Sequence, residues 1–173
     1  MHVGNSSPTL DLPVETLYFD LLQFLYHFAL VILVGGALVL GAAVAPALFA
    51  TARSRAEAGT TFGGVLARFD ALAIFAVVLL VVTSALKVGF EVTGVPEPRL
   101  VARWGLLLVL ALATLYSSGW ANPVARTIRR ETAGFDDLPQ GSPARVEFAR
   151  LHERSRRAMS LAVIVGLLAL FLS

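Results

Sequence analysis

The sequence predicts an all-α integral membrane protein, a bundle of four transmembrane helices in which a cytoplasmic amphipathic segment extends the fourth. Hydrophobic residues make up 57% of the 173 residues and charged residues 15%, against about 45–50% and about 25% in soluble globular chains. The apolar residues gather into four long runs, and the arginines lie beside these runs. A water-soluble enzyme domain is therefore excluded, and the lipid bilayer, not nucleic acid, is the expected partner.

The predicted organisation is an outer polar tail, residues 1–20, followed by one transmembrane domain, residues 21–173. The apolar runs place the four spans at about 21–50, 70–90, 103–121 and 143–172. The last apolar run begins only at Ala158, so the fourth helix needs preceding residues to reach spanning length. Ser142 is a suitable N-cap and Pro143 suits a first helical turn, so we expect this helix to begin near Pro143, with 143–157 amphipathic.

The distribution of Lys and Arg predicts the orientation. Residues 1–20 contain none, residues 51–69 and 87–103 contain three each, and residues 117–158 contain eight. Because positively charged loops stay on the cytoplasmic side, segments 51–69 and 117–158 are expected inside. This gives a protein of the bacterial inner membrane with both termini outside.

Small residues recur along the first predicted helix. Ala37, Gly41 and Ala45 are spaced at i, i+4 and i+8. Such a stripe lets a second helix approach closely, so it is interpreted as a packing surface, with a flat cofactor ring as the alternative.

His27 is the first candidate for chemistry, because ionisable groups inside a membrane are functional hypotheses by default. With Gln23 it lies on a polar stripe that enters from the outer surface, near the depth of Lys87 and Arg103. It is interpreted either as a histidine at headgroup level or as a haem b ligand, copper ligand or proton-relay group. The chain has no cysteine, so a metal would need His, carboxylate or backbone ligands, and no metal site is predicted.

The other polar candidates gather where the predicted spans meet the cytoplasm. They are Asp70, Asn122, Pro123, His152 and Ser155. His152 shares a helical stripe with Ser155, so we expect its ring to turn inward and bond Asn122, Ser118 or Asp70. The expected role is to fix the inner loop. His27 and His152 lie near opposite membrane surfaces, so one haem iron cannot bind both within one chain; a haem would need a single ligand, a dimer or a partner protein.

Three strings carry a resemblance to a known family. They are Ala45-Pro46-Ala47-Leu48-Phe49, Asn122-Pro123 followed by Arg126, and Phe148-Ala149-Arg150-Leu151-His152-Glu153-Arg154-Ser155. Together they resemble the transmembrane-protein-two-hundred-five-like family, small four-helix membrane proteins with a domain of unknown function. That family is distantly similar to copper-resistance-D membrane proteins and to the small haem-using protoporphyrinogen oxidase, a similarity carried by His27, Gly35 and Gly36. The resemblance implies a haem or copper role.

Three functions follow from the sequence. The first is a polytopic membrane protein without an evident catalytic motif, an accessory or small-molecule-handling bundle. The second is a haem- or copper-binding redox protein, and the third is a structural subunit of a homo-oligomer or larger membrane complex. Only Asp70 supplies a carboxylate at the edge of the spans, which argues against an ion-coupled transporter, and the sequence favours a protein that is not an enzyme.

Overall fold

The computed structural model describes residues 14–91 and 94–173, and this part of the chain is helical without strands. The first helical rod runs without interruption through α1 (Val14–Leu30), η1 (Val31–Gly35), α2 (Gly36–Val39), η2 (Leu40–Val44) and α3 (Ala45–Thr51). The second rod is α4 (Arg55–Glu91). The third comprises α5 (Pro98–Thr114), η3 (Leu115–Ala121) and α6 (Asn122–Glu131). The short η4 (Phe135–Asp137) precedes α7 (Pro143–Phe171).

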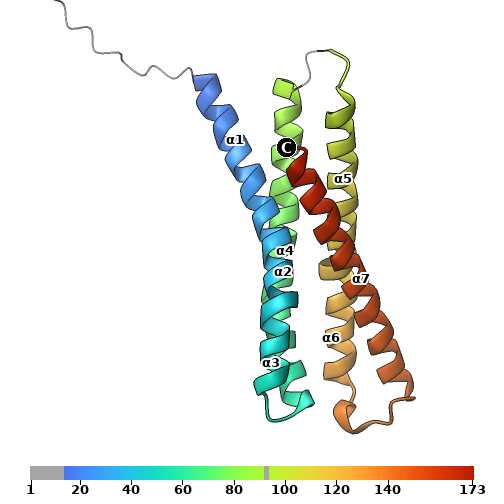
Figure 1. Ribbon diagram of the computed structural model, residues 1–173. Helices are drawn as coiled ribbons and strands as arrows, with labels where there is room; N and C mark the ends of the chain where they lie inside the picture. The colour runs from blue at the N-terminus through green and yellow to red at the C-terminus, as the bar shows by residue number, and fades with distance from the viewer. Residues whose placement is uncertain (1–13, 92–93) are drawn as a thin grey trace, which may run out of the picture.

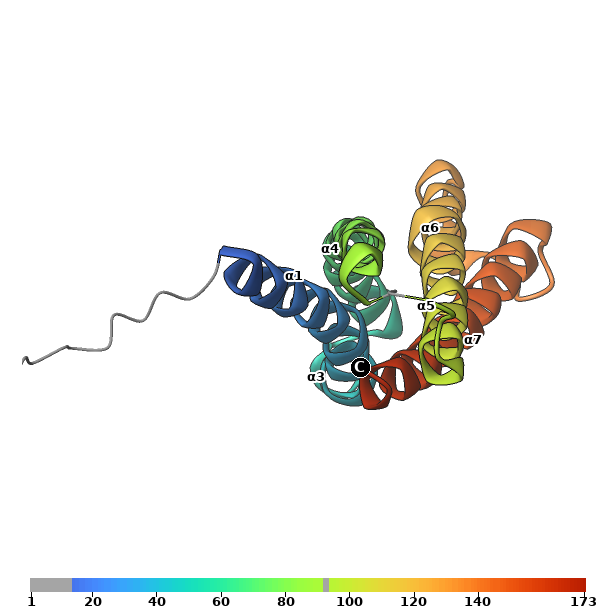
Figure 2. The ribbon, with the colours of Figure 1, turned by 90° about the horizontal axis from the view of Figure 1, so that it is seen from above.

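The rods lie antiparallel, in two groups (Figure 1). Seen from above, the first rod and α4 lie on one side and α5, α6 and α7 on the other (Figure 2). The end that holds the α3–α4 turn and the α6–α7 connection is called the basic end, because eight of the chain's arginines lie between residues 117 and 158. The helix α7 slants from the basic end across the bundle, so that Ser173 reaches α1.

The predicted all-helical membrane architecture is confirmed at the level of helices and apolar character. Among the described residues, three helices are long and apolar enough to cross a membrane: Thr16–Thr51, Arg55–Gly89 and Pro98–Glu131. The helix α7 is not among them, because its first half carries the charged side chains of the amphipathic segment. It begins at Pro143, as predicted, with Ser142 in the N-cap position, although the Ser142 side chain makes no capping bond.

The predicted outer tail ends earlier than expected. Residues 1–13 lie outside the described part, but α1 begins at Val14, so the last residues assigned to the tail are helical. The second and third rods also extend beyond their predicted spans at the basic end. Amphipathic helices continue past the edge of a bilayer, and an apolar run marks only their middle.

Wide π turns are part of the first and third rods. The turns η2 and η3 each precede a proline in the first turn of the following helix, Pro46 in α3 and Pro123 in α6. A proline lacks an N–H and its ring collides with the carbonyl four residues back, so the wider turn accommodates it without breaking the rod.

Within the described bundle, the predicted packing stripe contacts neighbouring helices along only part of its length. Ala37 is buried, but a Cβ at Gly41 would meet no atom within 4 Å, and Ala45 is only half-buried. The π turn η2 lies between Ala37 and Ala45, so the regular α-helical spacing from which the stripe was predicted does not hold across this stretch. Close packing depends instead on Gly166, where a Cβ would lie 2.5 Å from Val34 and 2.8 Å from Leu110.

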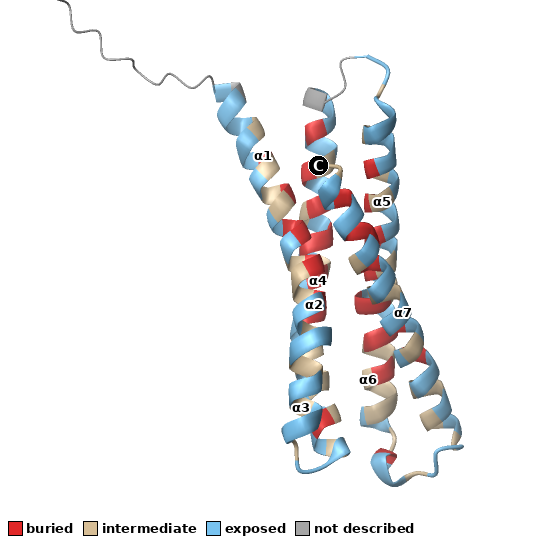
Figure 3. Ribbon diagram, viewed as in Figure 1, coloured by how far each residue is buried: buried red, intermediate tan, exposed pale blue. Residues whose placement is uncertain are grey.

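The core occupies the middle of the bundle, where buried residues follow the inward faces of all the rods (Figure 3). Leu30, Leu80 and Leu110 are almost completely buried, and α7 contributes Val165 and Ala169. A smaller cluster of Ala121, Ala125 and Leu151 joins α7 to the third rod near the basic end. Polar side chains lie on both sides of this core along the length of the bundle.

Candidate functional site

A buried polar network joins α4, the third rod and α7 on the basic side of the core. The Ser155 hydroxyl donates to Asn122 Oδ1 at 2.6 Å, and the Ser117 and Ser155 hydroxyls lie 2.7 Å apart. Asn122 Nδ2 donates to Asp70 Oδ1 at 2.9 Å, and Arg126 forms an ion pair with the other Asp70 oxygen. The sequence candidates Asp70, Asn122 and Ser155 therefore meet at one site.

The local backbone explains this convergence. Asn122 and Arg126 are one turn apart at the start of α6, so both face Asp70. Pro123 lies between them and is half-buried; it contributes the backbone conformation at the end of η3, not a polar group. Charge is compensated, because the Asp70 carboxylate, buried at 4% exposure, faces the Arg126 guanidinium. The arrangement ties three rods together.

The prediction for His152 is wrong. Its side chain is exposed and stacks on Phe148, with ring centroids 6.1 Å apart, and no hydrogen bond joins it to Asn122, Ser118 or Asp70 within the described structure. Ser155, three residues later, takes the inward position because the face of α7 that meets the third rod passes through Leu151 and Ser155. Partial desolvation by the surrounding chain lowers the pKa of His152, and the charge of Arg156 lowers it further.

A second polar cluster lies on the opposite side of the core. His27 Nε2 lies 3.2 Å from Ser173 Oγ and 3.5 Å from Gln23 Nε2. The Lys87 ammonium donates to Gln23 Oε1 and lies 4.5 Å from the centre of the Tyr26 ring. Gln23 and His27 therefore lie on one side of α1, and the polar atoms within hydrogen-bonding distance of His27 belong to an amide and a hydroxyl.

Nothing in this cluster supports a haem or copper site. Within the part of the chain that the structure describes, no group of three or more His, Cys, Asp or Glu residues could hold a metal ion. His27 instead lies within hydrogen-bonding distance of Gln23, on the same helix, and of Ser173, just beyond the end of α7.

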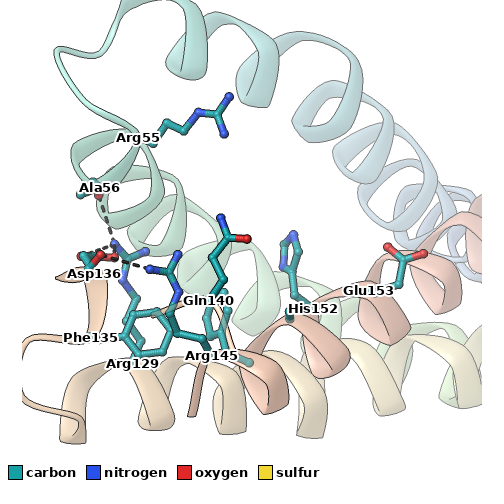
Figure 4. Close-up of a pocket in the computed structure, with 11 residues that line it drawn as sticks. Arg55, Ala56, Arg129, Phe135, Asp136, Gln140, Arg145, His152 and Glu153 are labelled. Atoms are coloured by element: carbon teal, nitrogen blue, oxygen red, sulfur yellow. Dashed lines mark hydrogen bonds and ion pairs between the residues drawn. The ribbon is translucent and has the colours of Figure 1, made fainter. Parts of the chain in front are cut away.

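A pocket of about 500 Å³ opens at the basic end, between the start of α4, the α6–α7 connection and the first turns of α7. Figure 4 shows Arg55 reaching into it from α4, opposite Gln140 and His152. The remaining lining residues are Ala56, Arg129, Phe135, Asp136, Arg145, Phe148, Ala149 and Glu153. Its volume falls in the range of small-molecule sites.

Two of the pocket's arginines are held by the protein. Arg129 donates to both Asp136 carboxylate oxygens, at 3.0 and 2.9 Å, and to the Ala56 carbonyl. Its guanidinium rests on Gly59, where a Cβ would lie 2.7 Å from Nη1. Arg145 donates to the carbonyls of Asp136 and Leu138, at 3.1 and 2.9 Å, so its charge has no carboxylate partner there. Arg145 therefore adds a positive charge to the pocket wall, whereas the charge of Arg129 is balanced by Asp136.

Sequence reasoning missed this pocket. The arginines of residues 117–158 were interpreted only as a sign of the cytoplasmic side, because arginines beside membrane spans usually mark that side. Arg129 and Arg145 lie on different elements and meet only through the fold of the α6–α7 connection. The available signal was Phe135 and Asp136, an aromatic–acidic pair inside a loop rich in Gly and Pro.

Three apolar helices and polar clusters confined to the two sides of the core define a polytopic integral membrane protein. The chain belongs to the family described as "Domain of unknown function (DUF4149)", which matches residues 28–133. This confirms the prediction of a family with a domain of unknown function, and it shows no link to the transmembrane-protein-two-hundred-five-like or copper-resistance-D proteins. No curated protein matches the chain. No solved structure matches it either.

Proposed function

We propose that the protein is a non-catalytic bundle of four spans that holds a small molecule at the cytoplasmic surface of the bacterial inner membrane. The observation that carries the proposal is the pocket at the basic end, which is large enough for a small organic molecule and is lined in part by the hydrogen-bonded guanidinium groups of Arg129 and Arg145. The matching family has no assigned reaction, and the polar residues of the buried network are occupied with one another.

The spacing of the two polar clusters supports four spans. Asp70 and Lys87 are 17 residues apart in α4, Arg103 and Asn122 are 19 apart in the third rod, and Ser155 and Ser173 are 18 apart at the end of the chain. These separations correspond to about 26, 28 and 27 Å of helix rise. They approach the roughly 30 Å hydrocarbon core of a bilayer. The helix α7 therefore crosses if Arg156 and Arg157 extend to the headgroups.

Reporter fusions test this topology. An alkaline phosphatase fusion after Ser173 should be active, because the enzyme works only after export, and a fusion within the 132–142 connection should be inactive. The reverse pattern, or two inactive fusions, would contradict the proposed orientation with both termini outside.

The absence of cysteine from the sequence makes a clean ligand assay available. Ala149→Cys places one thiol in the pocket wall, and Ala102→Cys places one on an exposed part of α5 at the other end. Each purified variant is labelled with an environment-sensitive fluorophore and titrated with small anionic, neutral and cationic solutes. We expect a saturable change for at least one class at Ala149 and none at Ala102. No saturable response at Ala149 to any class would refute a small-molecule site.

A further inference from the structure

Three hydrogen-bond donors in the pocket are not used by the protein. No hydrogen bond or ion pair connects Arg55, Gln140 or His152 to another residue in the described ranges, 14–91 and 94–173. They come from three different elements, the start of α4, the α6–α7 connection and α7, and they extend toward the same space (Figure 4). A ligand placed there meets a guanidinium, an amide and an imidazole from different directions.

The charge around this space favours an anion. Arg129 and Asp136 neutralise each other, whereas Arg145 bonds only carbonyls and an aromatic face, and Arg55 is exposed without an acidic partner in the described structure. The two acidic lining residues are engaged elsewhere, Asp136 with Arg129 and Glu153 with Arg156 and Arg157 on the outer side of α7. An anion therefore gains from two uncompensated guanidinium charges.

The arrangement of donors identifies the kind of anion. A carboxylate presents two oxygens in one plane, which suits one arginine. A phosphate monoester presents three acceptor oxygens in a tetrahedral arrangement, which suits donors that converge from three elements. Resting on the proposed function, we infer that the pocket binds a phosphate monoester, with Arg55, Gln140 and His152 as the phosphate ligands.

The other residues that line the pocket indicate the chemistry of the rest of the ligand. Phe135 and Phe148 form an apolar part of the wall, with ring centroids 5.2 Å apart, and they can cover a small organic group on the ester oxygen. Glu153 and Asp136 also line the space, but arginines pair with both, so Arg55, Gln140 and His152 are the donors left for the ligand, enough for one phosphate group. The pocket therefore suits a ligand with one phosphate group and a small uncharged body.

A phosphate monoester can belong to a membrane lipid or to a soluble molecule. His152 precedes Ser155 by less than one helical turn, so it lies just beyond the proposed edge of the hydrocarbon core, at the depth of lipid headgroups. A lipid whose headgroup is a phosphate monoester can enter from the membrane, and a soluble ester can enter from the cytoplasm.

The fluorophore at Ala149→Cys distinguishes them. The labelled protein in phosphatidylcholine nanodiscs is titrated with glycerol 3-phosphate, inorganic phosphate and acetate, and is compared with nanodiscs that also contain phosphatidic acid. Thermal unfolding of the unlabelled protein gives a second measurement. We expect saturable binding and stabilisation by glycerol 3-phosphate or by phosphatidic acid, and a response to acetate that is at least about tenfold weaker, since the acetate loses one charge-assisted hydrogen bond.

Matched arginine variants test the site. Arg55→Gln should weaken phosphate-ester binding by about tenfold or more, because it removes a charged donor, and Arg55→Lys should have an intermediate effect. Arg154→Gln removes the same charge from an exposed position of α7 outside the pocket and should leave binding unchanged.

The outcomes separate the two proposals. Equal weakening by Arg154→Gln and Arg55→Gln, or no response to either phosphate ester, would overturn the phosphate assignment. Binding of neutral or carboxylate solutes alone would overturn it as well, while leaving the proposed small-molecule function in place. Silence toward every solute would refute both.

Discussion

Replacing Asn122 with alanine tests whether the buried network holds the rods together. The amide donates to Asp70 and accepts from Ser155, and these bonds measure 2.9 and 2.6 Å between partners buried to 5% exposure or less. A hydrogen bond to a charged group contributes about 1.5–3 kcal/mol and a neutral one about 0.5–1.5 kcal/mol. Asp70 keeps Arg126 and Ser155 keeps Ser117, so we expect Asn122→Ala to lower the free energy of unfolding by about 2–4 kcal/mol.

A double-mutant cycle separates this interaction from cavity effects. Unfolding in mixed micelles with increasing SDS, followed by far-UV circular dichroism, gives free energies for Asn122→Ala, Ser155→Ala and the double variant. Hydrogen bonds between membrane helices average about 0.6 kcal/mol. We expect a coupling of about 1–1.5 kcal/mol, because consecutive bonds in a buried chain strengthen one another.

The matched control is Ser160→Ala, which removes an exposed hydroxyl of α7. Its coupling with Asn122→Ala should be near zero, since distant exposed groups add independently. If Ser155 coupled to Asn122 no more strongly than Ser160 does, the network would be a coincidence of packing and the reasoning would fail.

Two further measurements test other parts of the structure. Arg156→Gln should raise the pKa of His152 toward its ordinary value of 6.5, measured by NMR titration, because it removes a positive charge; an unchanged pKa would show that Arg156 does not act on the ring. Because the folded-state pKa is lowered, the unfolded chain binds the proton first as the pH falls below 6.5, so stability should decrease there, and His152→Gln should remove that part of the decrease in denaturation curves. Gly166→Ala should destabilise by about 1–3 kcal/mol, since its Cβ would lie 2.5 Å from Val34, while Gly41→Ala should stay within about 0.5 kcal/mol; equal effects in SDS unfolding would contradict the packing described.

The sequence predicted most accurately those features that depend on local signals and on depth in the membrane. The start of α7 near Pro143 followed from local signals alone, and the placement of Asp70, Asn122 and Ser155 at one depth of the membrane followed from their positions in the predicted spans, although the bonds among them were not predicted. Depth along a helix is fixed by 1.5 Å per residue and needs no knowledge of packing.

The facing of side chains was harder to predict. His152 and Ser155 lie on one predicted stripe and are only three residues apart in α7, yet Ser155 is buried in the core and His152 lies exposed at its margin. The packing face of the first rod was likewise predicted only in part, because Ala37 is buried in the bundle while a Cβ at Gly41 would face open space. The pocket depends on the α6–α7 connection, whose shape no periodicity describes.

The interval between the two polar clusters has an electrical consequence. Residues 71–86, 104–121 and 158–172 contain no Asp, Glu, Lys or Arg, and neither do residues 28–50. A membrane potential does about 2.3 kcal/mol of work per 100 mV on each elementary charge that moves through it. In the proposed placement Asp70, Lys87 and Arg103 lie at the ends of the voltage drop, where small displacements gain almost none of this energy. The bundle should act as an insulator with no gating charge, so an energised membrane should leave ligand binding at its pocket unchanged.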